Sequence, residues 1–87
     1  MATQILVVDD DVELRDLLRD YLARQGIEVS VLHDAGSLER RLERERPDLI
    51  VLDLMMPGVD GLTALRKLRA SGDDIPVIML TARADDV

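Results

Sequence analysis

A run of apolar residues that ends in a single carboxylate constrains this chain more than any other feature. Residues 49–52 are Leu-Ile-Val-Leu, Asp53 follows directly, and Pro57 and Gly58 mark a turn. A short apolar run bounded by turn residues is typical of a strand buried on both faces of a sheet. An aspartate at the carboxyl end of such a strand lies at the sheet edge where open α/β proteins bind ligands. We therefore expect Asp53 to lie at the functional edge of a sheet.

Three further segments have the character of strands, and amphipathic segments alternate with them. The strand segments are Gln4–Val8, Glu28–Leu32 and Val77–Leu80. The segments between them carry apolar residues at helical spacing, namely Leu14, Leu17, Leu18, Tyr21 and Leu22, then Ala35, Leu38 and Leu42, then Leu62, Leu65 and Leu68. This alternation predicts an α/β fold with a parallel sheet between helices. We expect the leucine stripe of the first helix to belong to the core.

The helix boundaries have recognisable sequence signals. Asp10 or Asp11 suits the N-cap of the first helix, and Asp10 with Glu13 has the spacing of a capping box. Gly26 is a suitable helix-ending residue, and Pro47 ends the second helix.

Composition excludes several classes of protein. At 87 residues the chain forms at most one small domain, and its net charge of −7 argues against nucleic-acid binding by the chain itself. It has no cysteine, which excludes disulfides and thiolate metal sites. No apolar run approaches the ~18 residues of a membrane span, and no signal peptide is recognisable. We expect a cytoplasmic protein without membrane contact.

Acidic residues follow the first and third strands directly. If the sheet order is 2-1-3-4, these strands are neighbours, which places Asp9, Asp10 and Asp53 in one crevice with Thr81 on its flank. Clustered carboxylates repel one another unless a cation intervenes, and an all-oxygen site suits Mg²⁺ or Mn²⁺. Aspartate is also a nucleophile towards phosphorus, and a hydroxyl such as that of Thr81 can donate to a phosphoryl oxygen.

Three segments together resemble the receiver domains of two-component response regulators. They are residues 5–11 (Ile-Leu-Val-Val-Asp-Asp-Asp), residues 53–58 with Asp60 and Gly61, and residues 77–82 (Val-Ile-Met-Leu-Thr-Ala). The resemblance implies a flavodoxin-like, CheY-like three-layer fold with a parallel sheet ordered 2-1-3-4. The sequences of residues 55–61 and 80–83 are most similar to those of the OmpR/PhoB class, whose members usually carry a DNA-binding output domain that controls transcription.

The resemblance also implies a role for each site residue. Asp53 would accept a phosphoryl group from a sensor histidine kinase, so that the chain is a signalling switch and not an enzyme in the usual sense. Asp10 would bind Mg²⁺ directly, and Asp9 directly or through water. Met55 would contribute its backbone carbonyl to the metal, and Thr81 would be the switch hydroxyl.

One departure from the resemblance concerns the end of the chain. Receiver domains have five strands and five helices, so we expect residues 1–87 to be a receiver domain that lacks the fifth strand, the last two helices and a lysine of the site. Residues 77–80 would then form an exposed apolar edge, which predicts a non-native or swapped dimer.

Other functions fit the residues less well. A small Mg²⁺-dependent phosphohydrolase of the haloacid dehalogenase type usually has a second aspartate where Met55 stands. A nucleotide or flavin binder needs a loop rich in backbone N–H donors, whereas the first loop here is Asp9-Asp10-Asp11. An inert receiver fragment is the remaining alternative.

Overall fold

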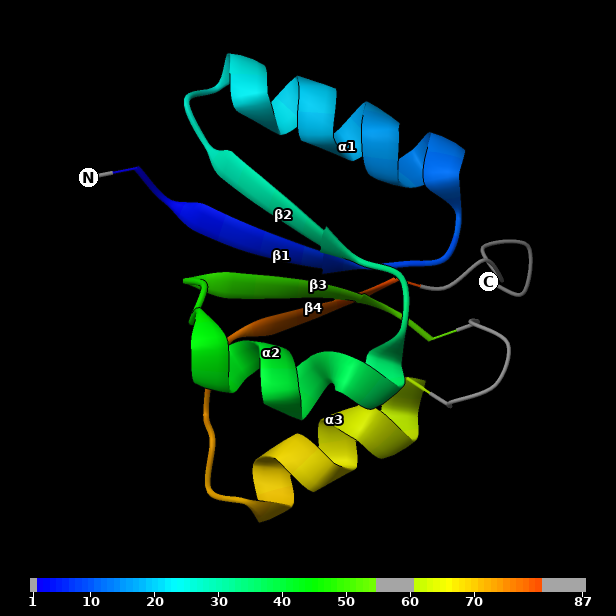
Figure 1. The fold of residues 1–87 in the computed structure, drawn as a ribbon, viewed down its shortest axis with the longest axis vertical. Coiled ribbons are helices and arrows are strands. Elements are labelled where there is room, and N and C mark those ends of the chain that lie inside the picture. Colours follow the sequence, from blue (N-terminus) through cyan, green and yellow to red (C-terminus); the bar gives the residue numbers. More distant parts are fainter. Residues whose placement is uncertain (1, 55–60, 81–87) are drawn as a thin grey trace.

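A computed structural model describes residues 2–54 and 61–80. Strands and helices alternate along this part of the chain (Figure 1). The elements are β1 (Gln4–Val8), α1 (Val12–Arg24), β2 (Glu28–Leu32), a short 3₁₀ turn η1 (Ala35–Ser37), α2 (Leu38–Arg44), β3 (Leu49–Asp53), α3 (Gly61–Ala70) and β4 (Val77–Leu80). The predicted alternation of strands and helices is confirmed.

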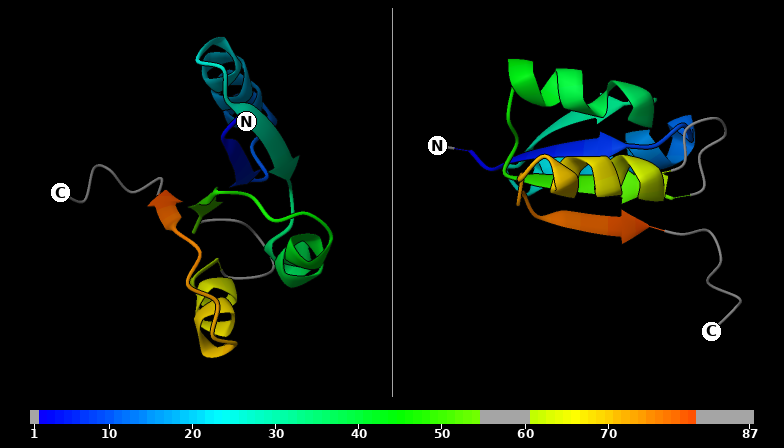
Figure 2. Two further views of the ribbon diagram at one scale, coloured as in Figure 1. Left: turned by 90° about the vertical axis from the view of Figure 1, so that its left-hand side faces the viewer. Right: turned by 90° about the horizontal axis from the view of Figure 1, so that it is seen from below.

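The four strands form one parallel sheet in the order β2-β1-β3-β4. Val8 of β1 is level with Leu32 of β2 on one side and with Leu52 of β3 on the other. Helix α1 covers one face of the sheet, and α2 and α3 cover the other (Figure 2). The predicted three-layer fold and strand order are therefore confirmed. None of the three α-helices in the described ranges has the length and hydrophobicity that a bilayer span requires.

The main core lies between the sheet and helices α2 and α3. Alternate residues of β1 and β3 point into it, because successive side chains of a strand lie on opposite faces. Its fully or nearly buried members are Leu6, Val8, Ala35, Leu38, Ile50, Leu52, Ala64, Leu68 and Ile75. On the α1 face, by contrast, Val51 is only partly buried. The expectation that β3 is buried on both faces is therefore confirmed for the face that carries Ile50 and Leu52 and is wrong for the α1 face, which is only partly buried.

Helix α1 corrects the prediction for the leucine stripe. Leu17 is 67% exposed and Tyr21 is 60% exposed, and the helix has no fully buried residue. Leu14, Leu18 and Leu22 form the half-buried line, with four-residue spacing. Helix α1 packs against β2 and is the single helix on its face in the described part of the chain. Leu17 and Tyr21 are therefore uncovered in the described part of the chain.

Of the two aspartates that the sequence suggests as the N-cap of α1, one takes this position. Asp11 is the N-cap, and its side chain accepts a hydrogen bond from the N–H of Leu14 at 3.2 Å. The alternative with Asp10 and Glu13 as a capping box is wrong. At the other end, Gly26 has a positive φ of 78° and its N–H donates to Ala23, which confirms its helix-ending role.

An ion pair joins two loops at the amino ends of β3 and β4. Arg46 donates two hydrogen bonds to the carboxylate of Asp73, at 2.8 and 2.6 Å. Asp73 also accepts the N–H of Ile75 at 3.0 Å. The hydrogen bonds from Arg46 lower the pKa of Asp73 from 3.8 to about 2, and the bond from Ile75 acts in the same direction. This contact fixes the loops on the side of the sheet opposite to the acidic cluster.

Candidate functional site

The carboxyl ends of β1 and β3 bring three aspartates together. Asp9 follows β1 directly, Asp53 is the last residue of β3, and the two strands are neighbours. One carboxylate oxygen from each of Asp9, Asp10 and Asp53 lies within 4.8 Å of the other two. The structure thus places these residues in one crevice at the sheet edge where ligands of α/β proteins bind.

Asp9 is the buried member of this cluster, with 1% of its surface exposed. Its Oδ1 accepts the N–H of Asp11 at 2.9 Å, and its own N–H donates to the carbonyl of Leu32 at 3.0 Å. Its Oδ2 is buried and has no hydrogen-bond partner among the described residues. Since a buried carboxylate oxygen without a partner is costly, this atom favours a cation in the crevice.

The electrostatics of Asp9 lead to the same conclusion. Burial raises the pKa of Asp9 above 3.8, the hydrogen bond from Asp11 opposes that rise, and the neighbouring carboxylate of Asp53 adds to it. Both the desolvation and the repulsion penalise the ionised form in the absence of a counter-charge. A divalent cation would remove both penalties at once.

The other two aspartates are progressively more accessible. Asp53 is half-buried and Asp10 is exposed, so the cluster runs from a buried ligand to the solvent. The N–H of Leu54 donates to the carbonyl of Leu80 at 3.0 Å, which holds the end of β3 against β4. The carboxylate of Asp53 is therefore on a fixed strand end, and a reactant can approach from the open side.

Gly61, the first residue of α3, touches the same strand end. A Cβ atom at this position would lie 2.6 Å from the carbonyl oxygen of Asp53 and 3.1 Å from the Cα of Leu54. Only glycine allows this close approach of α3 to the end of β3. In the sequence, Gly61 is recognisable only as part of a turn motif. Its place between a strand-end aspartate and a leucine stripe is the signal that could have indicated the contact of α3 with the end of β3.

Two predicted site residues, Met55 and Thr81, lie outside the described residues. Their roles as a metal-binding carbonyl and as a switch hydroxyl stay predictions.

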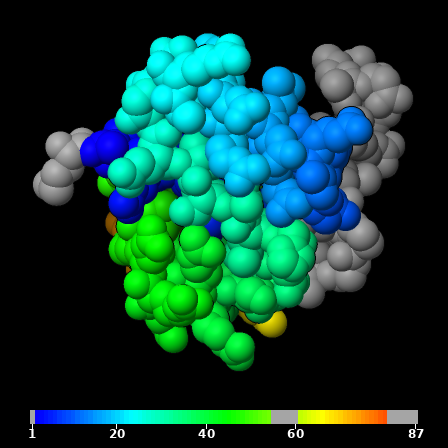
Figure 3. Space-filling view, turned by 45° about the horizontal axis from the view of Figure 1, so that its top comes forward, coloured from blue at the N-terminus to red at the C-terminus, as the bar shows by residue number. Residues whose placement is uncertain are grey.

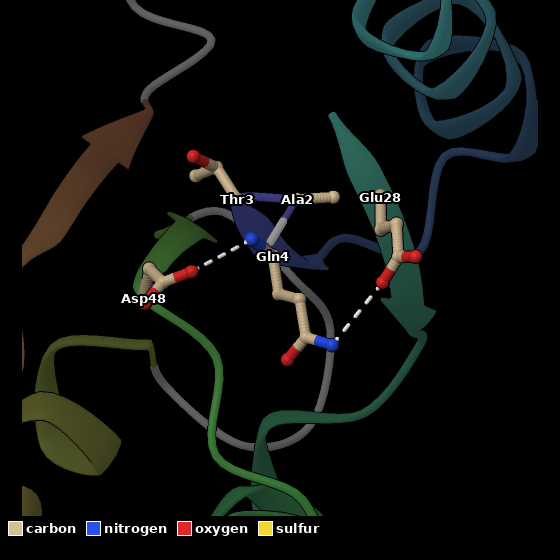
Figure 4. A pocket seen from close by; sticks show the side chains of 5 residues that line it. All are labelled: Ala2, Thr3, Gln4, Glu28 and Asp48. Atoms are coloured by element: carbon tan, nitrogen blue, oxygen red, sulfur yellow. Dashed lines mark hydrogen bonds between the residues drawn. The ribbon is translucent and has the colours of Figure 1, made fainter. Parts of the chain in front are cut away.

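A hollow of about 570 Å³ lies at the opposite edge of the sheet (Figure 4). Ala2, Thr3, Gln4, Glu28 and Asp48 line it. The backbone N–H of Gln4 donates to Asp48 at 2.8 Å, and the side-chain amide of Gln4 donates to Glu28 at 3.1 Å. Its acidic side chains thus already have partners. Parallel sheets bind ligands at their carboxyl edge, so the acidic crevice, and not this hollow, is the candidate site.

The donor set of the crevice suits a hard cation. Three carboxylates without histidine or cysteine favour Mg²⁺ or Mn²⁺ over Zn²⁺. The unpartnered oxygen of Asp9 and the short separations satisfy the structural requirement for such an ion.

Comparisons with known proteins agree with this geometry. The family model for the response regulator receiver domain matches residues 5–87. The response regulator MprA of Mycobacterium ulcerans is 47% identical over 83 residues, which are 95% of this chain and 36% of MprA. The chain therefore spans about a third of the length of this relative.

Solved structures are similar as well. The BeF₃-activated receiver domain of RstA from Klebsiella pneumoniae has a TM-score of 0.83 and 38% identity, and the match covers 92% of this chain and 68% of that one. The receiver domain of the Francisella response regulator 1452 has a TM-score of 0.86 and 32% identity, with 94% and 68% coverage. The parallel sheet, the acidic crevice at its carboxyl edge and these matches lead to one conclusion: the chain belongs to the receiver domains of two-component response regulators.

Proposed function

We propose that Asp53 is the phosphoacceptor of this receiver domain and that Asp9, Asp10 and Asp53 hold the Mg²⁺ ion that the reaction needs. The observation that supports this most is the cluster of three carboxylates within 4.8 Å, one of which has a buried oxygen without a partner. The phosphoryl donor is the phosphohistidine of a sensor histidine kinase.

In the proposed reaction, a carboxylate oxygen of Asp53 attacks the phosphorus atom of the donor. A phosphorus–oxygen bond forms, the phosphorus–nitrogen bond of the phosphohistidine breaks, and its electron pair returns to the imidazole. Bound Mg²⁺ supplies positive charge that offsets the charge on the phosphoryl oxygens. Asp9 is held in place by its two hydrogen bonds, so it is a preorganised ligand, whereas exposed Asp10 adapts to the ion.

Two residues complete this proposal. The backbone carbonyl of Met55 is a further metal ligand, and the hydroxyl of Thr81 donates a hydrogen bond to a phosphoryl oxygen. In a longer protein similar to MprA, this switch would control an output domain that regulates transcription.

The proposal is tested with a small phosphodonor, acetyl phosphate, in the presence of Mg²⁺. Intact mass spectrometry is expected to show one phosphoryl group on the wild-type chain and none on Asp53→Asn. Asp20→Asn, a change at an exposed aspartate of α1, is the matched control and keeps the modification. Persistence of the modification in Asp53→Asn would assign the phosphoryl group to another residue.

We also propose that the outer edge of β4 mediates self-association of the 87-residue chain. β4 is an outer strand of the described sheet, and Ile78 and Met79 are each 50% exposed on its opposite faces. An apolar edge without charged residues is a template for strand pairing. Light scattering after size exclusion at micromolar concentration is expected to show a dimer, and a clean monomer would refute this part of the proposal.

A further inference from the structure

The edge of the sheet formed by β2 has backbone groups that face outward. In β2, the N–H of Glu28 donates to Thr3 at 2.9 Å, and the carbonyl of Leu32 accepts from Asp9 at 3.0 Å. Since successive residues of a strand direct their backbone groups to opposite sides, Val29 and Val31 direct theirs away from β1. Within the described sheet, β2 has a neighbouring strand on one side only. This edge is therefore available to a further strand.

Helix α2 places arginines beside this edge. Arg40, Arg41 and Arg44 line a hollow of about 210 Å³ together with Leu32 and Ser37. Their spacing puts them on one side of α2, which we call the arginine stripe. The two glutamates of α2, Glu39 and Glu43, line a different hollow towards Leu68 and Asp73. The charges of α2 are thus separated by sign, with the positive side next to β2.

No carboxylate of the described residues forms an ion pair with the arginine stripe. Both carboxylate oxygens of Asp34 are engaged, with the N–H of Gly36 at 2.8 Å and the hydroxyl of Ser37 at 3.0 Å. Glu45 shares a neighbouring hollow with Arg41. Arg40 and Arg44 are exposed and form no ion pair within the described part of the chain. The stripe is a local excess of positive charge in a chain whose net charge is −7.

We propose that the β2 edge binds an extended acidic segment of a partner protein. The backbone of that segment pairs with Val29 and Val31, its carboxylates contact Arg40 and Arg44, and an aliphatic side chain contacts Leu32 in the hollow. Strand addition of this kind takes its affinity from main-chain hydrogen bonds and its specificity from alternate side chains. Figure 3 shows the face of the molecule on which the β2 segment lies between α1 and α2.

Charge favours a short peptide over the other anionic partners. Nucleic acids and anionic membranes extend well beyond one helix, so they would also face the acidic remainder of the chain. A short acidic peptide contacts the arginine stripe alone. The aspartates of the crevice make no contact with the peptide, so its binding does not depend on the proposed phosphorylation.

The test uses the 87-residue chain and a blocked peptide of alternating glutamate and valine. Fluorescence anisotropy at low salt is expected to show saturable binding. NMR of the ¹⁵N-labelled chain is expected to show the largest shifts at residues 29–32 and slower hydrogen exchange at Val29 and Val31. The double variant Arg40→Glu, Arg44→Glu is expected to weaken binding about tenfold or more, since two attractions become repulsions. The double variant Arg66→Glu, Lys67→Glu on α3 changes the net charge by the same amount, so it is the matched control and keeps the affinity.

Three results would overturn the inference. The first is the absence of binding to the wild-type chain. The second is an unchanged affinity in the double variant, whose fold is verified by circular dichroism. The third is tighter binding of a DNA duplex or of phosphatidylserine vesicles than of the peptide, because the stripe would then serve a different class of partner.

Discussion

Removal of one charge from the acidic crevice should stabilise the chain when no metal is present. In Asp9→Asn the amide oxygen still accepts the N–H of Asp11, as Oδ1 of Asp9 does at 2.9 Å. The new amide N–H₂ group can donate to the carboxylate of Asp53, which in the wild-type chain repels the carboxylate of Asp9. The substitution therefore keeps the local fold and removes a repulsion.

The size of this effect follows from the separation of the two carboxylates. Two unit charges 4.8 Å apart, the upper limit for the oxygens of Asp9 and Asp53, repel by about 3.5 kcal/mol at an effective dielectric constant of about 20. Because Asp53 is only half-buried, solvent screens part of this repulsion. We expect the free energy of unfolding to rise by about 1–3 kcal/mol, which corresponds to a Tm increase of roughly 5–15 °C in a chain of this size.

Magnesium should raise the free energy of unfolding of the wild-type chain more than that of Asp9→Asn. At a Mg²⁺ concentration ten times the dissociation constant, binding stabilises the wild-type chain by about 1.4 kcal/mol, and Asp9→Asn should gain much less. Urea denaturation with EDTA and with Mg²⁺ measures both effects, and Asp20→Asn is the control. A lower stability of Asp9→Asn in EDTA, or an equal gain from Mg²⁺ in both proteins, would refute the reasoning.

Three further predictions concern stability. Gly61→Ala should lower the free energy of unfolding by about 1–3 kcal/mol in urea denaturation, because its Cβ would lie 2.6 Å from the carbonyl oxygen of Asp53; an unchanged value would show that the strand end yields freely. Asp73 has a lowered pKa, so its ion pair with Arg46 contributes fully above pH 3.8 and is lost as the pH falls towards 2. Wild type should thus be more stable than Asp73→Asn at pH 6, and the difference should shrink between pH 4 and 2; a constant difference would contradict the assignment. Leu52→Ala should cost about 2–5 kcal/mol, because Leu52 is fully buried, and calorimetry would measure the loss.

The fold could be predicted from the sequence because its signals are local. The apolar runs of β1 and β3 and the leucine spacing of the helices identify the elements, and their alternation implies a parallel sheet. The positions of Asp9 and Asp53 at the ends of neighbouring strands then follow from the strand order.

Other features depend on tertiary contacts that no local pattern reports. The spacing of Leu17 and Tyr21 places them near the apolar side of α1, but their exposure depends on what covers that side. Three consecutive aspartates each suit a helix cap, and the choice of Asp11 follows once Asp9 is turned into the crevice. The contact between Gly61 and the end of β3 likewise exists only in the folded chain.

The two outer strands of the sheet differ chemically, and this difference limits how copies of the chain can assemble. Pairing of β4 with β4 of a second copy is symmetric and closes after two chains. Pairing of β4 with β2 would continue from copy to copy and produce a filament. In that arrangement the apolar residues Ile78 and Met79 would meet the strand beside Arg40 and Arg44, whose charges would lose water without gaining a counter-charge. We therefore expect the arginines beside β2 to disfavour open-ended polymerisation.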